Sequence, residues 1–124
     1  MTQQGDRSSQ NAVDLPDLLL RVDNDHDLLC ELIEMFKEEF PRVLQSLQQS
    51  VVREDIKNVE VTSHALKGML SGLSVTRAAA IASQLEQMGR DRKSSGITET
   101  LALLEHEVAN LLPELDAYTA QAKP

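Results

Sequence analysis

The sequence predicts an all-α protein, an up-down antiparallel four-helix bundle with a short extra N-terminal helix. Apolar residues recur at spacings of three and four along most of the chain, and no stretch shows the strict alternation of a half-buried strand. Hydrophobic residues make up 41% of the sequence but aromatic residues only 2%, so aliphatic side chains must fill the core. Four amphipathic helices of similar length, joined by short turns, favour antiparallel neighbours.

The overall composition limits the classes of partner. A chain of 124 residues suits one domain and can bury a modest core. The net charge of -8 repels nucleic acid and anionic lipid, so we expect neither as a partner, and we expect a monomer. Cys30 is the single cysteine, which rules out an internal disulfide. With no apolar run of membrane-spanning length and no signal-peptide pattern, we expect a cytoplasmic location.

The chain divides into a helical domain and two polar ends. Residues 1–13 carry almost nothing to bury and are predicted to form a flexible lead. The helical domain is predicted to cover residues 14–118. Residues 119–124 are expected to be a loose tail.

The first two predicted helices have clear start signals. Asp14 is a candidate N-cap and Pro16 suits a first turn, which predicts a short helix over about 15–22. A long second helix is predicted to begin near Asp25. Pro41 lies inside it and should bend it, because proline removes a backbone donor and its ring crowds the preceding turn. The apolar stripe of this helix keeps its phase across the proline and consists of Leu28, Leu29, Leu32, Ile33, Phe36, Phe40, Val43, Leu44, Leu47 and Val51.

Three further helices follow. The third is predicted over about 55–71 and the fourth over about 75–90, where alanines permit close approach to a neighbour. The last is expected as one helix after Gly96, with Thr98 as a capping candidate and a bend or frayed end at Pro113. The residues predicted to face the core from these helices are Ile56, Val59, Ser63, Leu66, Leu70, Leu73, Ala78, Ile81, Ala82, Leu85, Met88, Ile97, Leu101, Leu104, Val108, Leu111 and Leu115.

The third helix carries one histidine, His64, on its polar face. Successive helical residues turn by about 100°, which points His64 away from Leu66 and Leu70. The residues that share its side of the helix are Glu60, Lys67, Gly68 and Ser71. His64 is therefore expected in water, with a carboxylate one turn before it and an ammonium about one turn after it.

These residue types suit a covalent carrier of an electrophilic group. A glycine inside a helix costs roughly 1 kcal/mol relative to alanine, so we interpret Gly68 on the wet face as clearance for a partner. Lys67 supplies positive charge beside the ring. With an ordinary histidine pKa of about 6.5, His64 is largely neutral at pH 7 and keeps a nucleophilic lone pair. No carboxylate pair or activated serine points to hydrolysis.

Other polar residues have less specific interpretations. Glu60 accepts a hydrogen bond from the His64 ring in one interpretation and is a solvated charge in the other, which we favour. Ser71 lines a docking face or is simply polar surface, and we favour surface. His26 and His106 are interpreted as surface residues. The three histidines lack the spacing of metal ligands, so no metal site is expected.

The segment His64-Ala65-Leu66-Lys67-Gly68 resembles the His-x-Leu-Lys-Gly signature of histidine-containing phosphotransfer (Hpt) domains. The upstream pattern from Leu28-Leu29 to Phe36 and the later pair Leu85-Glu86 also resemble the family. The similarity covers roughly residues 14–117. One difference is Ser74, at a position where the family usually has glycine; Gly72 precedes it and is a candidate to end the helix instead.

The resemblance implies a phosphocarrier of multistep phosphorelays, a four-helix bundle that passes a phosphoryl group between aspartates of receiver domains. His64 matches the histidine phosphorylated on Nε2, Lys67 the lysine that steadies the phosphoryl group, and Gly68 the glycine that opens the docking face. No cofactor is expected in this chain, and Mg²⁺ is expected on the partner receiver. Without an ATP-binding segment, no kinase activity is expected. The alternative function is a helical-bundle adaptor that binds a receiver or kinase partner without transferring phosphate.

Overall fold

The computed structural model describes residues 11–122, and every regular element in this range is an α-helix. The six helices are α2 (Leu15–Arg21), α3 (His26–Val52), α4 (Ile56–Gly72), α5 (Thr76–Arg90), α6 (Ile97–Val108) and α7 (Leu111–Ala122). The predicted all-α class is confirmed. Among the described helices, none combines the length and the apolar character that a membrane crossing requires.

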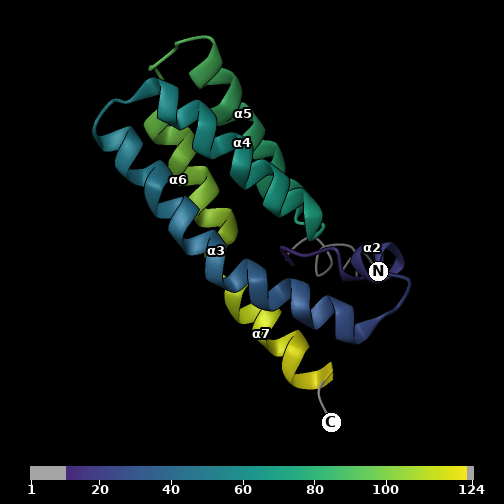
Figure 1. Ribbon diagram of the computed structural model, residues 1–124. Helices are drawn as coiled ribbons and strands as arrows, with labels where there is room; N and C mark the ends of the chain where they lie inside the picture. Colours follow the sequence, from purple (N-terminus) through teal and green to yellow (C-terminus); the bar gives the residue numbers. More distant parts are fainter. Residues whose placement is uncertain (1–10, 123–124) are drawn as a thin grey trace, which may run out of the picture.

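The long helix α3 runs through most of the length of the molecule, and α4, α6 and α7 pack against it (Figure 1). α4 and α6 pack against the upper half of α3 in this view, α5 packs on α4 and α6, and α7 lies beside the lower half of α3. The most extensive contact between two helices joins α4 to α5. The short α2 lies near the end of α4. The third and fourth predicted helices are thus the most closely associated pair, as the alanines of the fourth predict.

Aliphatic side chains from these helices fill the core. Most of the residues predicted to face inward are buried, but Leu28 of the predicted α3 stripe is exposed. The predicted inward residues that are only partly buried are Leu32, Val43, Leu44, Val51, Ile56, Ile81 and Met88. Phe36 and Phe40 stack on each other inside α3 with ring centroids 4.7 Å apart. The largest fully buried side chains include Leu18, Leu29, Ile33, Leu47, Leu66, Leu70, Leu85, Leu104 and Leu111.

Aspartates begin three of the helices. The carboxylates of Asp14, Asp25 and Asp55 each accept a hydrogen bond from the backbone N–H three residues later, at 3.2, 2.9 and 3.1 Å. The predicted cap at Asp14 is confirmed. Pro41 lies inside α3, which stays one helix and changes direction near its middle (Figure 1). The single bent helix predicted from the continuous apolar stripe is therefore correct.

The last predicted helix is wrong in two details. It is divided into α6 and α7, and Pro113 lies in the first turn of α7. A proline is tolerated there because its missing N–H would have no helical partner, whereas in an unbroken helix its ring would crowd the preceding turn. Thr98 lies inside α6 rather than capping it. The residue before α6 is Gly96, which has φ of 90°, a value that glycine adopts without a Cβ penalty.

The limits of the packed part differ from those predicted. Residues 1–10 of the predicted lead and 123–124 of the predicted tail lie outside the described range. Inside it, Val13 is buried and its N–H donates to the Glu114 carboxylate at 2.9 Å. Thr119 is also buried, and α7 continues beyond it. Packing therefore begins before residue 14 and continues past residue 118.

The turn after α4 is formed by Ser74, at the position where glycine was expected from the family resemblance. Ser74 has φ of 58°, in the left-handed region, whereas Gly72 is still helical. The Ser74 hydroxyl donates to Asp17 at 2.7 Å and accepts from Arg21 at 3.2 Å. Arg21 also donates to the carbonyl of Ser71 at 2.6 Å. These bonds offset the backbone strain and fasten α2 to the end of α4.

Ser74→Ala is expected to lower the free energy of unfolding by about 1–2 kcal/mol, because it removes both hydroxyl bonds and keeps the left-handed strain. Ser74→Gly removes the same bonds but relieves the strain, so it should be less destabilising. Urea unfolding followed by circular dichroism measures both. An alanine variant as stable as the wild type would contradict the proposed role of the hydroxyl.

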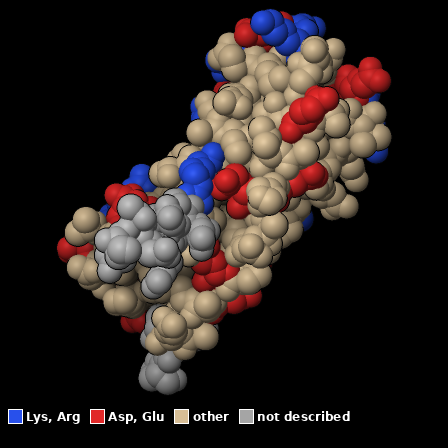
Figure 2. Space-filling view, turned by 180° about the vertical axis from the view of Figure 1, so that it is seen from behind, with Lys and Arg blue, Asp and Glu red and all other residues tan. Residues whose placement is uncertain are grey.

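The charges of the chain are not evenly distributed. Lys and Arg side chains gather at one end of the molecule, at the top of Figure 2, where α5 ends and the loop 91–96 follows. This loop contains Arg92 and Lys93, both exposed. The protein therefore has a basic end despite its net charge of -8.

Candidate functional site

His64 projects from α4 into solvent. Its side chain is 69% exposed. The neighbours Thr62 and Ser63 are buried on the opposite side of the helix, against the core. The spacing of apolar residues predicted this orientation. The imidazole is therefore accessible to a second protein.

A buried carboxylate lies beneath the exposed ring. Glu86 of α5 is 5% exposed, and its Oε2 atom lies 2.9 Å from Nδ1 of His64. Its other oxygen, Oε1, lies 2.8 Å from Nζ of Lys67. Oε2 also accepts from Nη2 of Arg90 at 2.8 Å. Three donors thus satisfy a carboxylate whose burial would otherwise be costly.

These donors keep Glu86 ionised. The Lys67 ammonium is the main cause that lowers the pKa of the Glu86 carboxyl; burial opposes it, and the His64 ring acts in the same direction as Lys67. An ionised carboxylate only accepts hydrogen bonds, so Nδ1 of His64 must carry the proton that is donated to it. In the neutral ring, the lone pair is then on Nε2.

Glu86 is the partner that the sequence analysis missed. Glu60, the carboxylate considered for this role, pairs with Lys57 at 3.4 Å and with Arg90 at 3.5 Å. It makes none of the hydrogen bonds found for His64 among the described residues. The sequence feature that could have identified Glu86 is its position, a carboxylate on the apolar face of α5 directly after the buried Leu85.

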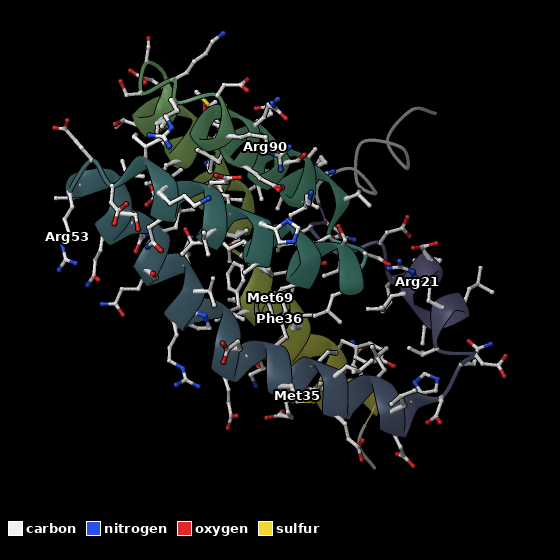
Figure 3. The ribbon with its side chains drawn as sticks, turned by 45° about the horizontal axis from the view of Figure 1, so that its top comes forward. Arg21, Met35, Phe36, Arg53, Met69 and Arg90 are labelled. Atoms are coloured by element: carbon white, nitrogen blue, oxygen red, sulfur yellow. The ribbon has the colours of Figure 1, made fainter. Side chains whose placement is uncertain are left out.

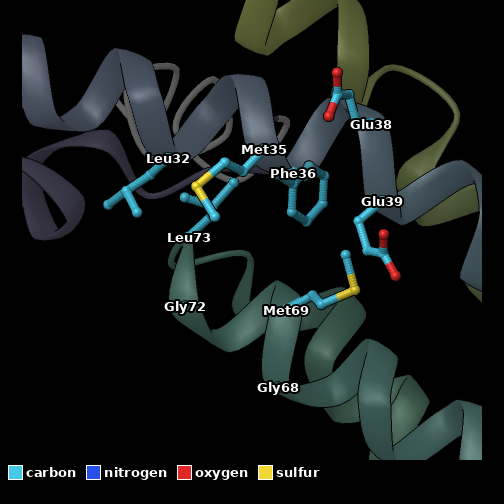
Figure 4. Close-up of a pocket in the computed structure, with 9 residues that line it drawn as sticks. All are labelled: Leu32, Met35, Phe36, Glu38, Glu39, Gly68, Met69, Gly72 and Leu73. Carbon is cyan, nitrogen blue, oxygen red and sulfur yellow. The ribbon is translucent and has the colours of Figure 1, made fainter.

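Gly68 opens onto an apolar groove. Apart from the adjacent backbone of α4 itself, no atom lies within 4 Å of a Cβ placed at Gly68. Beside it, α3 and α4 enclose a groove of about 540 Å³ (Figure 4). The side chains of Met35 and Phe36 from α3 and of Met69 from α4 point into this groove (Figure 4), while Arg90 lies on α5 (Figure 3). The residues that line the groove are Leu32, Met35, Phe36, Glu38, Glu39, Gly68, Met69, Gly72 and Leu73.

The remaining candidates are less closely connected to the ring. Ser71 is exposed on the same side of α4 and borders a shallow hollow together with Lys67 and Arg21. His26 stacks on Tyr118 of α7, and Nδ1 of His26 lies 2.6 Å from the tyrosine hydroxyl. Within residues 11–122, no group of three or more His, Cys, Asp or Glu side chains has an arrangement that could hold a metal ion.

A family model described as "Hpt domain" matches residues 31–117. The chain belongs to the Hpt domain family. The match runs from α3 into α7 and includes His64, Lys67 and Glu86. Neither the curated proteins nor the solved structures gave a match. Hpt domains are phosphocarrier modules of two-component phosphorelays, in which they interact with receiver domains.

Cations and carboxylates form a network of ion pairs around the site of this Hpt domain. Its cations are Lys57, Lys67 and Arg90, and its carboxylates are Glu60 and Glu86. Lys67 is 35% exposed, so its ammonium reaches both the buried Glu86 and the solvent around the imidazole. A dianionic group on the ring would therefore enter a locally favourable potential in a protein that is acidic overall.

Glu86→Gln is expected to lower the free energy of unfolding by about 1–3 kcal/mol at neutral pH, because it removes the charge that three donors share. The pKa of Glu86 is lower in the folded than in the unfolded chain, where it has its ordinary value of 4.5. Its contacts therefore stabilise the fold fully above that pH and are lost as the pH falls through the folded pKa.

Urea unfolding of the wild type and of Glu86→Gln at a series of pH values measures how the difference in their free energies of unfolding depends on pH. The difference between wild type and Glu86→Gln should shrink below about pH 4.5. Glu31→Gln, at an exposed position of α3, is the matched control and should stay within about 0.5 kcal/mol of wild type. A difference for Glu86→Gln that is constant with pH would contradict an ionised Glu86.

Proposed function

We propose that this Hpt domain accepts a phosphoryl group on Nε2 of His64 from a receiver-domain aspartate and passes it to an aspartate of another receiver. The observation that carries the proposal is the exposed imidazole whose Nδ1 is held by Glu86, with Lys67 alongside. This arrangement leaves Nε2 as the nucleophilic atom. It needs no ATP site, in keeping with a carrier rather than a kinase.

The transfer step balances without loss of a proton. The Nε2 lone pair attacks phosphorus, the P–O bond to the receiver aspartate breaks, and its electron pair stays on the aspartate carboxylate. The phosphorylated ring keeps the Nδ1 proton and carries a positive charge. Glu86, 2.9 Å from Nδ1, stabilises that charge. The second transfer reverses these changes at another aspartate.

Lys67 is proposed to steady the phosphoryl group. An ammonium has three N–H donors, and Glu86 occupies one of them at 2.8 Å. The others remain available for phosphoryl oxygens near Nε2. We propose that the chain holds no cofactor of its own and that Mg²⁺ is supplied by the receiver, where it would neutralise charge on the same phosphoryl group.

The groove between α3 and α4 is the proposed docking surface for receivers. It begins at Gly68, one turn after His64, so a receiver that covers it brings its aspartate to the imidazole. Its apolar floor and the exposed Met35 favour an apolar patch on the partner. Glu38 and Glu39 at its edge favour neighbouring Lys or Arg on that partner.

We also propose an up-down four-helix arrangement, with α6 and α7 in place of the last predicted helix. A monomer without nucleic-acid or membrane partners is proposed on the charge of -8. A cytoplasmic location is proposed on the single cysteine and the lack of a signal-peptide pattern.

Incubation of the purified protein with phosphorylated receiver domains tests the proposal. The expected product is an acid-labile, base-stable phosphate on this chain, which a second receiver then removes. Receivers that bind the chain without transferring phosphate would contradict it and favour the adaptor function. Transfer measured against every receiver of the source organism would identify the donor and the acceptor.

A further inference from the structure

α5 approaches α4 closely at Gly89. A Cβ placed on Gly89 would lie 2.8 Å from the backbone nitrogen of Glu60, and 2.9 Å from both its Cα and its Cβ. Real Cβ atoms essentially never lie that close to another atom. Because two of the three atoms belong to the α4 backbone, no side-chain rotation could relieve the contact. Gly89 thus forms a backbone-to-backbone contact between the helices.

This contact lies within one helical turn of the site. On α5, Glu86 precedes Gly89 by one turn and Arg90 follows it directly. Both reach across to α4: Glu86 bonds to His64, and Arg90 pairs with Glu60. The spacing of the two helices at Gly89 therefore sets how far the Glu86 carboxylate is from the imidazole.

We propose that Gly89 is a positioning residue for phosphotransfer, because its missing side chain lets α5 bring Glu86 within reach of Nδ1 of His64. Relieving the contact that alanine would create requires the helices to separate by about half an ångström. The same movement would take the 2.9 Å bond between Glu86 and His64 towards the limit of hydrogen bonding. Its role in transfer rests on the proposed function, but its effect on the imidazole does not.

The first test reads the protonation of the ring in the full chain. With ¹⁵N-labelled histidine, NMR distinguishes the two ring nitrogens of neutral His64. The wild type is expected to carry its proton on Nδ1. Gly89→Ala should shift both nitrogen signals towards a mixture of tautomers. Glu86→Asp shortens the carboxylate side chain without touching the contact between the helices, and it should give the same shift.

Gly68→Ala is the matched control for the NMR measurement on Gly89→Ala. It adds the same methyl group to α4 at a position where no atom beyond the adjacent α4 backbone lies within 4 Å. Alanine is favoured over glycine in a helix, so this variant should be more stable and keep the wild-type nitrogen signals. Wild-type signals in Gly89→Ala, or in Glu86→Asp, would overturn the proposal. So would loss of helical circular dichroism in Gly89→Ala, because Gly89 would then serve folding alone.

The second test measures transfer and binding separately. Gly89→Ala and Glu86→Asp should each slow transfer from a phosphorylated receiver roughly tenfold, the effect of losing one charge-assisted hydrogen bond. Receiver affinity should be unchanged, because the groove lies between α3 and α4. Equal losses of affinity and rate would overturn the positioning role. If the wild type accepts no phosphate, the proposed function fails, whereas the NMR readings still decide the role of Gly89.

Discussion

His64→Gln is expected to accept no phosphoryl group from any receiver while its helical circular dichroism stays that of the wild type. The amide nitrogen of glutamine has no nucleophilic lone pair, so no P–N bond forms. The fold should tolerate the change because the His64 side chain is 69% exposed. Glu86 keeps Lys67 and Arg90 as partners.

Phosphate labelling by a phosphorylated receiver measures this loss. The matched controls are His26→Gln and His106→Gln, which change the other two histidines and should label like the wild type. Labelling that persists in His64→Gln would exclude His64 as the acceptor.

Gly68→Gln is expected to slow transfer from receivers by about tenfold or more, the effect of forcing extra atoms into a packed interface. The free protein has room for the side chain, since no atom beyond the adjacent α4 backbone lies within 4 Å of a Cβ at this position. Glutamine favours helix over glycine, so the variant should be more stable by about 0.5–1 kcal/mol. A variant that is more stable but slower in transfer would show that the added side chain blocks the approach of the receiver to His64.

Two comparisons separate docking from chemistry. Phosphoramidate, a small phosphodonor that needs no docking surface, should label His64 equally in Gly68→Gln and in the wild type. Ala102→Gln adds the same side chain at an exposed position of α6, which does not line the groove, and should leave receiver transfer unchanged. Wild-type receiver transfer in Gly68→Gln would refute the access interpretation.

Much of the fold follows from the spacing of apolar residues, because each helix has one stripe that only the core can cover. The division between α6 and α7 does not follow from it. Val108, Leu111 and Leu115 keep a spacing of three and four across the break. A periodic pattern is therefore unchanged whether the helix continues or restarts, and Pro113 alone did not determine where the break lies.

The sequence predicts only those residues of the candidate site that lie on one helix. His64, Lys67 and Gly68 lie on α4, so helical geometry places them on one side without any knowledge of the other helices. Glu86 and Gly89 lie on α5, and their relation to His64 depends on the register and separation of two helices. The spacing of residues within one helix contains no information about the register or the separation of two helices.

The atom that carries the phosphoryl group gives the most direct test of this account. NMR of the ¹⁵N-histidine-labelled protein after transfer identifies the phosphorylated ring and the nitrogen bonded to phosphorus. We predict Nε2 of His64, with the proton still on Nδ1 and donated to Glu86. Phosphate on Nδ1 of His64, or on His26 or His106, would contradict the account.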